Sequence, residues 1–494
     1  MRSDGAAVLA LDVGTWTTRL MAFGEDGRRI AAAGVPTPAV LQGSEATIDV
    51  DRLWRTVAGL IDRLGSLVST VAGLAVTAQL GTVFTDDSLS PTVPARLWAD
   101  SRASLEAARL GQLLGAQGIR TAGRRIPPES AAAQAIWLRG RAPDAWKRTR
   151  RILSLKDYLV SRLTGAMLTD PASASFTGLL DVRSVEWSAT LLKAADVSEG
   201  MLPSVRSGTT MAGRVLGEAA KATGLPAGLP VAVGGPDGSL GVIGAGGTGD
   251  GATVDVAGST DVLYRLGNRP PEGAGSGLIL NAFLERGLWA IGGPTGLTGG
   301  AISWLASTLG YGSPREMYER IGPRIDLVPA GAGGLVFRTA LSGERLPSWN
   351  PRCRGVLAGL GVDLTAAHIV RAAEEGCAFA VAEGIDALRQ AGQSVHDIVV
   401  VGGASMRPSS LQLRADAWGC EVRTVEEQEA SALGAAITAA VAVGLFPSLA
   451  DAAARMVRPG RTYVPDERRQ AVMRQARERW RGLEAAACMD RHLL

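Results

Sequence analysis

Two short segments, almost half a chain apart, repeat one pattern of an apolar stretch, an aspartate and a turn of glycine and hydroxyl residues. Residues 7–19 (AVLALDVGTWTTR) hold the first copy and residues 254–262 (VDVAGSTDV) hold the second. Each copy predicts a strand, a tight turn and a returning strand, because a glycine between apolar runs lets the backbone reverse. One such hairpin is common in proteins. Two in one chain predict a duplicated fold in which each half supplies one turn.

Length and composition limit the class of protein. A chain of 494 residues is too long for one compact core and predicts about two to four domains. With 46% hydrophobic and 20% charged residues, the composition is that of a soluble globular protein. A net charge of +3 gives no strong field toward nucleic acid or a membrane surface. No signal peptide or membrane-length apolar stretch is visible, so we expect no nucleic-acid or membrane partner and a cytoplasmic location.

The cysteines and histidines narrow the chemistry. The four cysteines are far apart and form no CxxC pair, which argues against a zinc site or a disulfide framework and fits a reducing cytosol. With only three histidines, the chain offers few candidates for a histidine base. We therefore expect a carboxylate to do any acid–base work.

Strands and helices alternate in both halves, which predicts an α/β protein. The glycine-rich stretch 244–251 is the expected boundary, giving domains 1–246 and 247–494. The expected elements are strands at 7–13, 72–78, 230–234, 253–257, 262–266, 288–292 and 397–401, and helices at 101–114, 366–391, 409–419, 428–444 and 466–487.

The first turn has the chemistry of a phosphate site. Gly14 lets backbone N–H groups approach an anion, Thr15 and Thr17 add hydroxyls, and Arg19 adds positive charge. Asp12 would repel a phosphate unless a cation lay between them, so it indicates Mg²⁺ held largely through water. The alternative is an ordinary hairpin with a Gly-Thr turn.

Two further glycine segments add to this picture. The turn at 258–260 is a weaker signal alone and gains value from its likeness to the first. Gly402 and Gly403 follow the apolar strand 398–401 and precede an amphipathic helix. A strand, a glycine turn and a helix N-terminus form a suitable platform for a nucleotide, although a plain strand-to-helix turn would look the same.

Asp237 stands in the sequence Gly234-Gly235-Pro236-Asp237-Gly238, between the two hairpins. A carboxylate in such a place can orient an acceptor hydroxyl and take its proton during phosphoryl transfer. The alternative is an aspartate in a polar turn.

Together these segments resemble the FGGY family of carbohydrate kinases over about residues 7–445. The most specific stretch, 354–376, resembles the family's second signature, except that Glu374 stands where the family usually has an apolar residue. Residues 156–187 resemble the N-terminal domain, and residues 98–102 (WADSR) resemble its substrate-side Trp-x-Asp-x-Arg.

The resemblance implies two actin-like (ribonuclease H-like) domains with a nucleotide and sugar cleft between them. It implies ATP and Mg²⁺ as cofactors, a sugar or polyol as substrate, Asp237 as the catalytic base and Asp12 on the metal side. Family members are often dimers, so a homodimer is compatible with it. Ser259 and Thr260 exchange the family's usual Thr-Ser order but keep both hydroxyls. The implied nucleotide-binding residues are Gly14, Thr15, Trp16, Thr17, Arg19, Gly258, Ser259, Thr260, Gly299, Gly402, Gly403 and Ala404.

A different loop indicates which sugar or polyol accepts the phosphoryl group. The implied substrate-binding residues are Gln79, Leu80, Trp98, Asp100 and Asp237. Xylulose kinases usually show Gln-Met-His-Gly at this loop, whereas here residues 79–81 read Gln-Leu-Gly, so the histidine contact is missing.

Glycerol kinases carry an Arg-Glu pair at that loop and a glutamine after the catalytic aspartate. The present loop has Leu80 and Gly81, and Gly238 follows Asp237, which disfavours glycerol. We expect a pentulose such as xylulose. Another ketose or polyol (ribulose, erythritol-like), an actin-like ATPase and a regulator without sugar turnover remain open.

Overall fold

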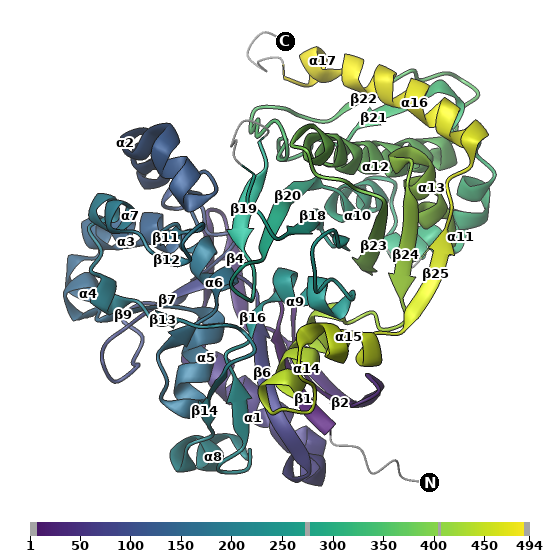
Figure 1. Cartoon of the computed structure of the whole chain (residues 1–494). Helices are drawn as coiled ribbons and strands as arrows, with labels where there is room; N and C mark the ends of the chain where they lie inside the picture. The colour runs from purple at the N-terminus through teal and green to yellow at the C-terminus, as the bar shows by residue number, and fades with distance from the viewer. Residues whose placement is uncertain (1–6, 272–276, 404–406, 489–494) are drawn as a thin grey trace, which may run out of the picture.

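The computed structural model describes residues 7–271, 277–403 and 407–488, and it shows two halves built on one plan (Figure 1). The N-terminal sheet has the order β14-β15-β6-β1-β2-β3, with β16 beside β6. Its strands are β1 (Ala7–Val13), β2 (Thr17–Gly24), β3 (Arg29–Pro36), β6 (Val71–Ala78), β14 (Met211–Arg214), β15 (Pro230–Ala232) and β16 (Gly235–Pro236).

The C-terminal sheet has the order β19-β20-β18-β17-β23-β24-β25. Each sheet contains an antiparallel hairpin, β1–β2 in the first and β17–β18 in the second. The first strand of each hairpin also pairs in parallel with another strand, β1 with β6 and β17 with β23. The duplication predicted from the two turns is therefore confirmed. The strands are β17 (Thr253–Ala257), β18 (Thr260–Gly267), β19 (Ile279–Ala282), β20 (Trp289–Leu297), β23 (Asp397–Gly402), β24 (Glu421–Val425) and β25 (Pro459–Tyr463).

All seven expected strands and five expected helices are present. The helix expected at 101–114 continues to Ala122, because at Gly115 (φ 57°) the chain kinks and then resumes the helix. A glycine adopts this left-handed conformation with little strain. The corresponding helices are α2 (Ser104–Ala122), α12 (Ala366–Gln390), α13 (Pro408–Trp418), α14 (Ala430–Ala442) and α16 (Glu467–Gly482).

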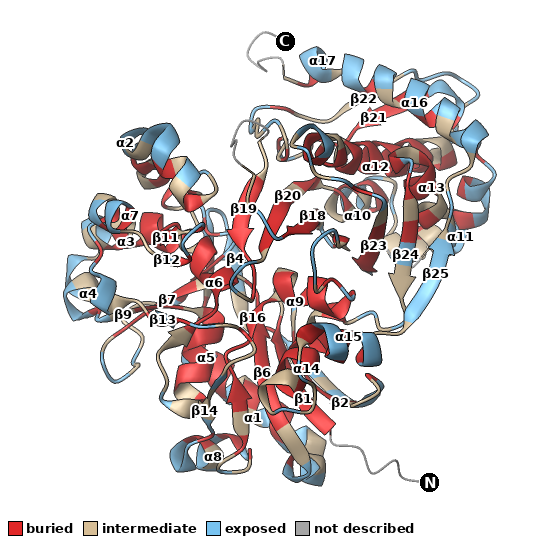
Figure 2. Ribbon diagram, viewed as in Figure 1, coloured by how far each residue is buried: buried red, intermediate tan, exposed pale blue. Residues whose placement is uncertain are grey.

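Two helices join the halves. Helix α9 (Asp237–Gly244) and α14 lie against each other between the two sheets, in the buried centre of the molecule (Figures 1 and 2). They approach closely, because a Cβ at Gly434 would collide with the backbone oxygen of Leu240. Their apolar faces share one core with Val8 of the first hairpin and Val254 of the second. The division at residue 246 stays a prediction, since this core continues across it.

A smaller five-stranded sheet, β4-β5-β8-β7-β9, flanks the N-terminal half and carries the expected substrate loops. Its strands are β4 (Ala39–Gln42), β5 (Glu45–Ile48), β7 (Gly81–Thr85), β8 (Ala95–Leu97) and β9 (Arg151–Ser154). The remaining α-helices are α1 (Val50–Leu64), α3 (Ala131–Arg141), α4 (Pro143–Arg148), α5 (Leu155–Thr164), α6 (Pro171–Phe176), α7 (Ala189–Ala195), α8 (Gly217–Thr223), α10 (Gly299–Thr308), α11 (Pro314–Asp326), α15 (Leu449–Met456) and α17 (Glu484–Ala487). Three short pairs complete the strands: β10 (Leu168–Thr169) with β13 (Ser204–Val205), β11 (Leu180–Asp181) with β12 (Glu186–Trp187), and β21 (Val336–Arg338) with β22 (Val356–Ala358).

The C-terminal helix corrects one expectation. Helix α16 packs Met473, Ala476 and Trp480 onto the second half. It also brings Cys488 to Cys353, and the two form a disulfide across a sequence separation of 135 residues. The expectation that the cysteines form no disulfide is therefore wrong for this pair, because the fold brings together two cysteines that are distant in sequence.

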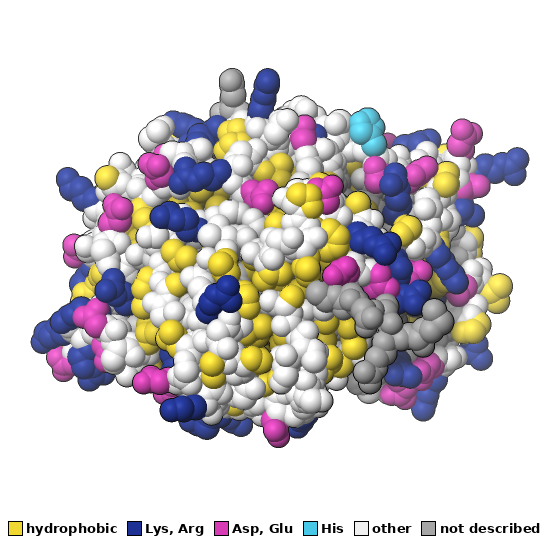
Figure 3. All heavy atoms as spheres, turned by 60° about the horizontal axis from the view of Figure 1, so that its bottom comes forward, with side chains coloured by type: hydrophobic (Ala, Val, Ile, Leu, Met, Phe, Trp, Pro, Cys, Tyr) yellow, Lys and Arg dark blue, Asp and Glu magenta, His cyan; other side chains and the backbone are white. Residues whose placement is uncertain are grey.

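The surface carries charges of both signs. Figure 3 shows a face on which Lys and Arg are interspersed with Asp and Glu, in keeping with the small net charge. Among the described residues, no helix combines the length and the apolar character needed to cross a membrane.

Candidate active site

Asp12 and Asp237 come to the same edge of the N-terminal sheet. Asp12 lies near the end of β1 in register with Thr77 of β6, and Thr77 is in register with Gly235 of β16. Helix α9 begins at Asp237, directly after β16. Since β1, β6 and β16 run parallel, their carboxyl ends share one edge. Two carboxylates far apart in sequence therefore lie close enough to influence each other.

The electrostatics of this pair are unusual. Asp12 is only 5% exposed, and burial together with the charge of Asp237 raises its pKa to about 7, against the opposing effect of Arg19. Burial also raises the pKa of Asp237 to about 6, although the Gly238 N–H donates to its Oδ1 at 2.7 Å. Perturbed carboxyl groups of this kind are characteristic of functional sites. A divalent cation bound by oxygen ligands would relieve the repulsion between them.

A buried lysine supports the segment that leads to Asp237. Lys156 Nζ lies 2.6 Å from Asp157 and 3.1 Å from Asp170, and it donates to the Val233 carbonyl at 2.9 Å. Next to Val233, Gly234 (φ 74°) passes so close to the Val76 carbonyl that a Cβ would collide with it. Sequence analysis noted this lysine only as part of a resemblance. Its role depends on partners that the chain brings together from separate elements.

The first turn is tied to the expected substrate residues. The Gly14 N–H donates to the Thr17 carbonyl at 3.1 Å, which closes the turn. Trp98 Nε1 donates to Thr15 Oγ1 at 3.0 Å, and the Thr15 hydroxyl donates to Gln79 Oε1 at 3.3 Å. Gln79 Nε2 in turn donates to the Gly14 carbonyl at 3.2 Å. The structure thus brings the predicted phosphate and acceptor residues into one network.

Two other residues of this hairpin take different positions. Trp16 is 70% exposed at the tip of the turn. Arg19 Nε lies 3.4 Å from Glu429 Oε1, at the start of α14. The charge predicted to face phosphate therefore already faces a carboxylate from the C-terminal half.

The second turn borders a cavity of about 860 Å³ in the C-terminal half. Four predicted nucleotide-binding residues line it: Gly258, Ser259, Gly299 and Gly403. The turn rests on the N-terminus of α10, since the Gly300 N–H donates to the Ser259 carbonyl at 2.9 Å. A helix N-terminus in this position favours an anionic group.

Three predicted residues near this turn do not line the cavity or cannot be placed. Thr260 of β18 pairs with Leu297 of β20. Gly402 (φ 90°) ends β23 and approaches Ala257 so closely that a Cβ would collide with its backbone oxygen. Ala404 lies outside the described residues.

Sequence analysis missed one charged wall of the cavity. Arg407 Nη1 lies 2.6 Å from Glu374 Oε1, and its guanidinium lies 4.1 Å from the ring of Tyr318. The Ser410 hydroxyl donates to the same oxygen of Glu374 at 3.0 Å. Glu374, the departure from the family signature, is thus the partner of an arginine. That departure was the only sequence signal for this cluster.

Sequence analysis also missed Arg414, which pairs with two aspartates of the second hairpin. Arg414 of α13 reaches Asp255 at 2.5 Å and Asp261 at 2.7 Å, and both carboxylates are fully buried. Thr298 Oγ1 also donates to Asp261 Oδ1 at 2.6 Å. The aspartates of this hairpin therefore serve the fold, unlike Asp12.

Asp100 does not present a free carboxylate to an acceptor. Arg102 Nη2 donates to its Oδ2 at 2.7 Å, the Ala46 N–H donates at 3.2 Å, and Gln134 Nε2 donates to Oδ1 at 3.3 Å. Burial works to raise the pKa of Asp100, but these hydrogen bonds outweigh it and hold the pKa below its usual value. These donors hold the Asp100 carboxylate in place, and its role as a substrate contact stays a prediction.

Leu80 and Trp98 do face open space. They line a small cavity of about 40 Å³ together with Arg124, Glu129 and Phe176. The cavity lies beside the first turn, because Trp98 bonds to Thr15. Two residues predicted to bind the acceptor, Leu80 and Trp98, therefore line it.

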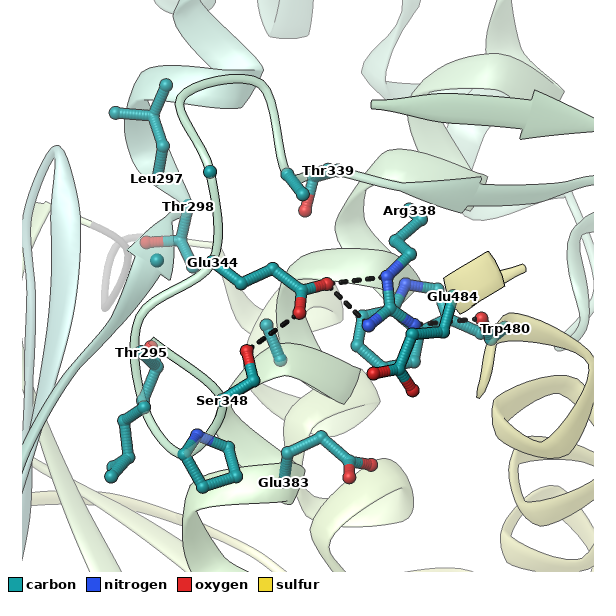
Figure 4. A pocket seen from close by; sticks show the side chains of 16 residues that line it. Thr295, Leu297, Thr298, Arg338, Thr339, Glu344, Ser348, Glu383, Trp480 and Glu484 are labelled. Atoms are coloured by element: carbon teal, nitrogen blue, oxygen red, sulfur yellow. Dashed lines mark hydrogen bonds and ion pairs between the residues drawn. The ribbon is translucent and has the colours of Figure 1, made fainter. Parts of the chain in front are cut away.

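A third cavity, of about 190 Å³, lies between α16 and the loop at 339–348 (Figure 4). Two of its charged groups pair with each other: Arg338 Nε donates to Glu344 Oε1 at 2.6 Å, and Ser348 donates to Glu344 Oε2 at 2.8 Å. The Arg338 guanidinium also stacks 4.2 Å from the Trp480 ring. No predicted site residue lines this cavity.

Comparison with known proteins agrees with this geometry. The N-terminal domain of the FGGY family of carbohydrate kinases matches residues 7–244, and the C-terminal domain matches residues 254–443. A xylulose kinase from Bacillus subtilis (strain 168) is 27% identical over 467 residues, covering 93% of this chain and 92% of the relative. An autoinducer-2 kinase from Yersinia enterocolitica is 28% identical over 518 residues, covering 97% of this chain and 94% of the relative.

Solved structures extend the likeness to the fold. A xylulose kinase from Rhodospirillum rubrum is 26% identical with a TM-score of 0.86, covering 97% of this chain and 98% of that chain. The expected pair of actin-like domains is therefore confirmed. Since both family domains match and together span most of the chain, this protein belongs to the FGGY family of carbohydrate kinases.

Proposed function

We propose that this kinase transfers the γ-phosphoryl group of ATP to a hydroxyl of a pentulose such as xylulose, with Asp237 as the general base. The observation that carries the proposal is the placement of Asp237 at the sheet edge it shares with Asp12, with a pKa raised to about 6. A base with a pKa close to the working pH takes up the hydroxyl proton most effectively. Phosphoryl transfer otherwise depends on positioning and charge neutralisation, which two facing turns supply.

The remaining roles follow the geometry. The second turn and the N-terminus of α10 would bind the phosphates of ATP, with the nucleoside in the adjoining cavity. Asp12 would hold Mg²⁺ on the phosphate side, with water and phosphate oxygens as the other ligands. This fits the described residues, which contain no cluster of three Asp, Glu, His or Cys that could bind a metal alone. Mg²⁺ would neutralise charge on the transferred group.

Two observations favour a pentulose as the acceptor. Relatives named xylulose kinases cover almost the whole chain. Gln79 and Trp98 connect the acceptor cavity directly to the first turn. A relative named autoinducer-2 kinase makes another polyhydroxylated acceptor the second candidate. We place the reaction in the cytosol, where ATP is available.

The proposal is tested by measuring ADP release from ATP and Mg²⁺ against a panel of ketoses, aldoses and polyols. Stimulation by a pentulose is the expected result. Stimulation by a different sugar or polyol would replace the acceptor but keep the kinase. Hydrolysis of ATP that no acceptor increases would overturn sugar phosphorylation and favour an actin-like ATPase or regulator.

Asp237→Asn tests the base. The substitution keeps the shape of the side chain but cannot accept the proton, so we expect the sugar-stimulated rate to fall by ~10²–10⁴-fold while ATP binding persists. Asp144→Asn, on the exposed helix α4, is the matched control and should leave the rate unchanged. If the Asp237 variant kept most of its activity, another group would be the base.

A further inference from the structure

The acceptor cavity contains an arginine whose donors the fold leaves unused. Nε and Nη1 of Arg124 are shielded from solvent and have no hydrogen-bond partner among the described residues. The guanidinium lies 4.8 Å from the ring of Phe176, which fixes its plane without satisfying its N–H groups. Hiding unpaired donors of a charged group is unfavourable, so their retention indicates a ligand.

A carboxyl group accompanies this arginine. Glu129, five positions along the chain, lines the same cavity. Burial raises the pKa of Glu129, and the charges of Arg124 and of Arg345 oppose that rise. The cavity therefore offers a group that only donates beside a group that accepts when it is ionised.

Tyr264 lies near both Arg124 and the base Asp237. Tyr264 of β18 interacts electrostatically with both Arg124 and Asp237, and burial raises its pKa to about 12, so it stays a neutral phenol. The Tyr264 hydroxyl lies 3.7 Å from the position of a Cβ on Gly238, next to the base. An acceptor whose hydroxyl meets Asp237 would thus extend toward Arg124.

The other cavity shows what a satisfied cluster looks like. There Glu344 accepts hydrogen bonds from both Arg338 and Ser348 (Figure 4). The N–H at Arg338 Nε is therefore not free to bind a ligand. Arg124 has no such partner. The contrast separates a charge that supports the fold from one that awaits a ligand.

The loop at 79–81 supplies the remaining step. It has Leu80 and Gly81 where the usual xylulose-kinase loop has methionine and histidine, so it lacks the histidine as a donor for the acceptor. Leu80 lines the same cavity as Arg124. Arg124, which lies between α2 and α3, can supply a donor in place of the missing histidine.

We propose that Arg124 and Glu129 form the specificity pair of the acceptor site: Arg124 donates to the keto oxygen of a ketose, and Glu129 accepts from the adjacent hydroxyl. A keto oxygen only accepts, whereas its neighbouring hydroxyl donates, so the pair matches an α-hydroxy ketone. This inference rests on the proposed function, since it concerns the acceptor of the same reaction.

The test compares Arg124→Met with Arg125→Met, the exposed neighbouring arginine. Steady-state kinetics are measured with a ketopentose and with the matching pentitol at saturating ATP. Arg124→Met should raise the KM for the ketopentose by about 10–100-fold, the loss expected for a hydrogen bond to a charged donor, and leave the KM for ATP unchanged. Arg125→Met should leave both constants unchanged.

A second variant covers the case in which Arg124→Met fails to fold. Glu129→Gln keeps the size of the side chain and should also raise the ketopentose KM, with its thermal unfolding near that of the parent. Binding of ketopentose to the Asp237→Asn protein, followed by calorimetry, should weaken to the same degree when either substitution is added. This readout follows acceptor binding without turnover.

The outcomes separate this inference from the proposed function. If no acceptor stimulates the parent enzyme, sugar phosphorylation itself falls. If a ketose is phosphorylated but neither Arg124→Met nor Glu129→Gln changes its KM, the specificity pair alone is overturned. A parent enzyme that prefers a pentitol or a sugar acid to the ketopentose would also overturn the assignment of the keto oxygen.

Discussion

The two hairpins have the same local design and opposite electrostatic surroundings. In the first, Asp12 lies near the end of β1 beside a second carboxylate, and its pKa rises to about 7. In the second, Asp255 lies one position further from the turn in β17; burial and the charge of Asp261 raise its pKa as well, but Arg414 bonds to both aspartates. Burial alone would lower the pKa of Arg414, but these two carboxylates raise it instead. The first hairpin leaves Asp12 beside a like charge, whereas in the second one arginine pairs with both aspartates.

This difference teaches how a duplicated element divides its work. A buried carboxylate with a full set of partners contributes to the fold, and removing its partner is strongly unfavourable. A buried carboxylate that faces another carboxylate is held at a cost in stability, which a bound cation would offset. The predictions below test this division, beginning with the largest effect.

Arg414→Met should lower the free energy of unfolding by about 3–5 kcal/mol, because it leaves two buried carboxylates without a positive charge. Urea unfolding followed by fluorescence measures this change. Adding Asp255→Asn and Asp261→Asn to the variant should recover much of the loss. Arg423→Met removes an arginine whose ion pairs are half exposed and should change the free energy by less than ~1 kcal/mol. Equal stability of the Arg414 and Arg423 variants would contradict the structural role of the second hairpin.

Asp12→Asn should have the opposite sign. At pH 8 without Mg²⁺ the neutral amide removes a buried charge, so we expect the free energy of unfolding to rise by about 1–3 kcal/mol while the kinase activity falls sharply. Arg414→Met, which removes the positive partner of the buried aspartates in the second hairpin, should lower it. The same urea titrations at pH 8 make the comparison. If both variants lost stability alike, the two hairpins would not differ in the way described.

Local patterns were enough to predict most of the fold. The strands at 7–13 and 253–257 were placed exactly as the structure has β1 and β17, because each is an apolar run that ends at a turn. Helix α2 was ended too early, since the sequence does not show whether a glycine such as Gly115 kinks a helix or stops it.

The site was harder to predict because its partners are distant in sequence. Arg414 meets Asp255 across a separation of 159 residues, and nothing near either residue announces the pair. Asp100 was assigned to the acceptor from its motif, yet its carboxylate is engaged by Arg102, two residues away. A motif identifies which residues gather at a site, whereas the hydrogen bonds decide which of them remain free for a ligand.

The stability of the parent protein should depend on pH and Mg²⁺ through the first hairpin. The pKa of Asp12 is about 7 in the folded protein and 3.8 ordinarily, so the folded state binds more protons than the unfolded state between these values. Without Mg²⁺, stability should therefore fall as the pH rises from about 4 to about 7 and level off above it. Asp237, with a pKa of about 6, contributes the same sign over a narrower range.

Mg²⁺ needs the ionised carboxylates, so its stabilising effect should be small at pH 5 and reach about 1.4 kcal/mol at pH 8 when its concentration is ten times its Kd. Thermal unfolding with and without MgCl₂ at the two pH values measures this difference. The Asp12→Asn variant should lose most of it. An equal effect of Mg²⁺ at both pH values in the parent protein would place the ion elsewhere.

The smallest expected difference concerns the hydroxyls of the two turns. The Thr15 hydroxyl is bonded to Trp98 and Gln79, whereas the Ser259 side chain is exposed and has no hydrogen-bond partner among the described residues. Thr15→Val should therefore disturb the acceptor loop and raise the KM for the sugar, in addition to any effect on ATP. Ser259→Ala should change only the KM for ATP. Each loss should be about 2–10-fold, as expected for one neutral hydrogen bond. Steady-state kinetics with each substrate varied in turn measure the KM for the sugar and the KM for ATP separately. A sugar KM that changes equally in both variants would show that the first turn has no special link to the acceptor.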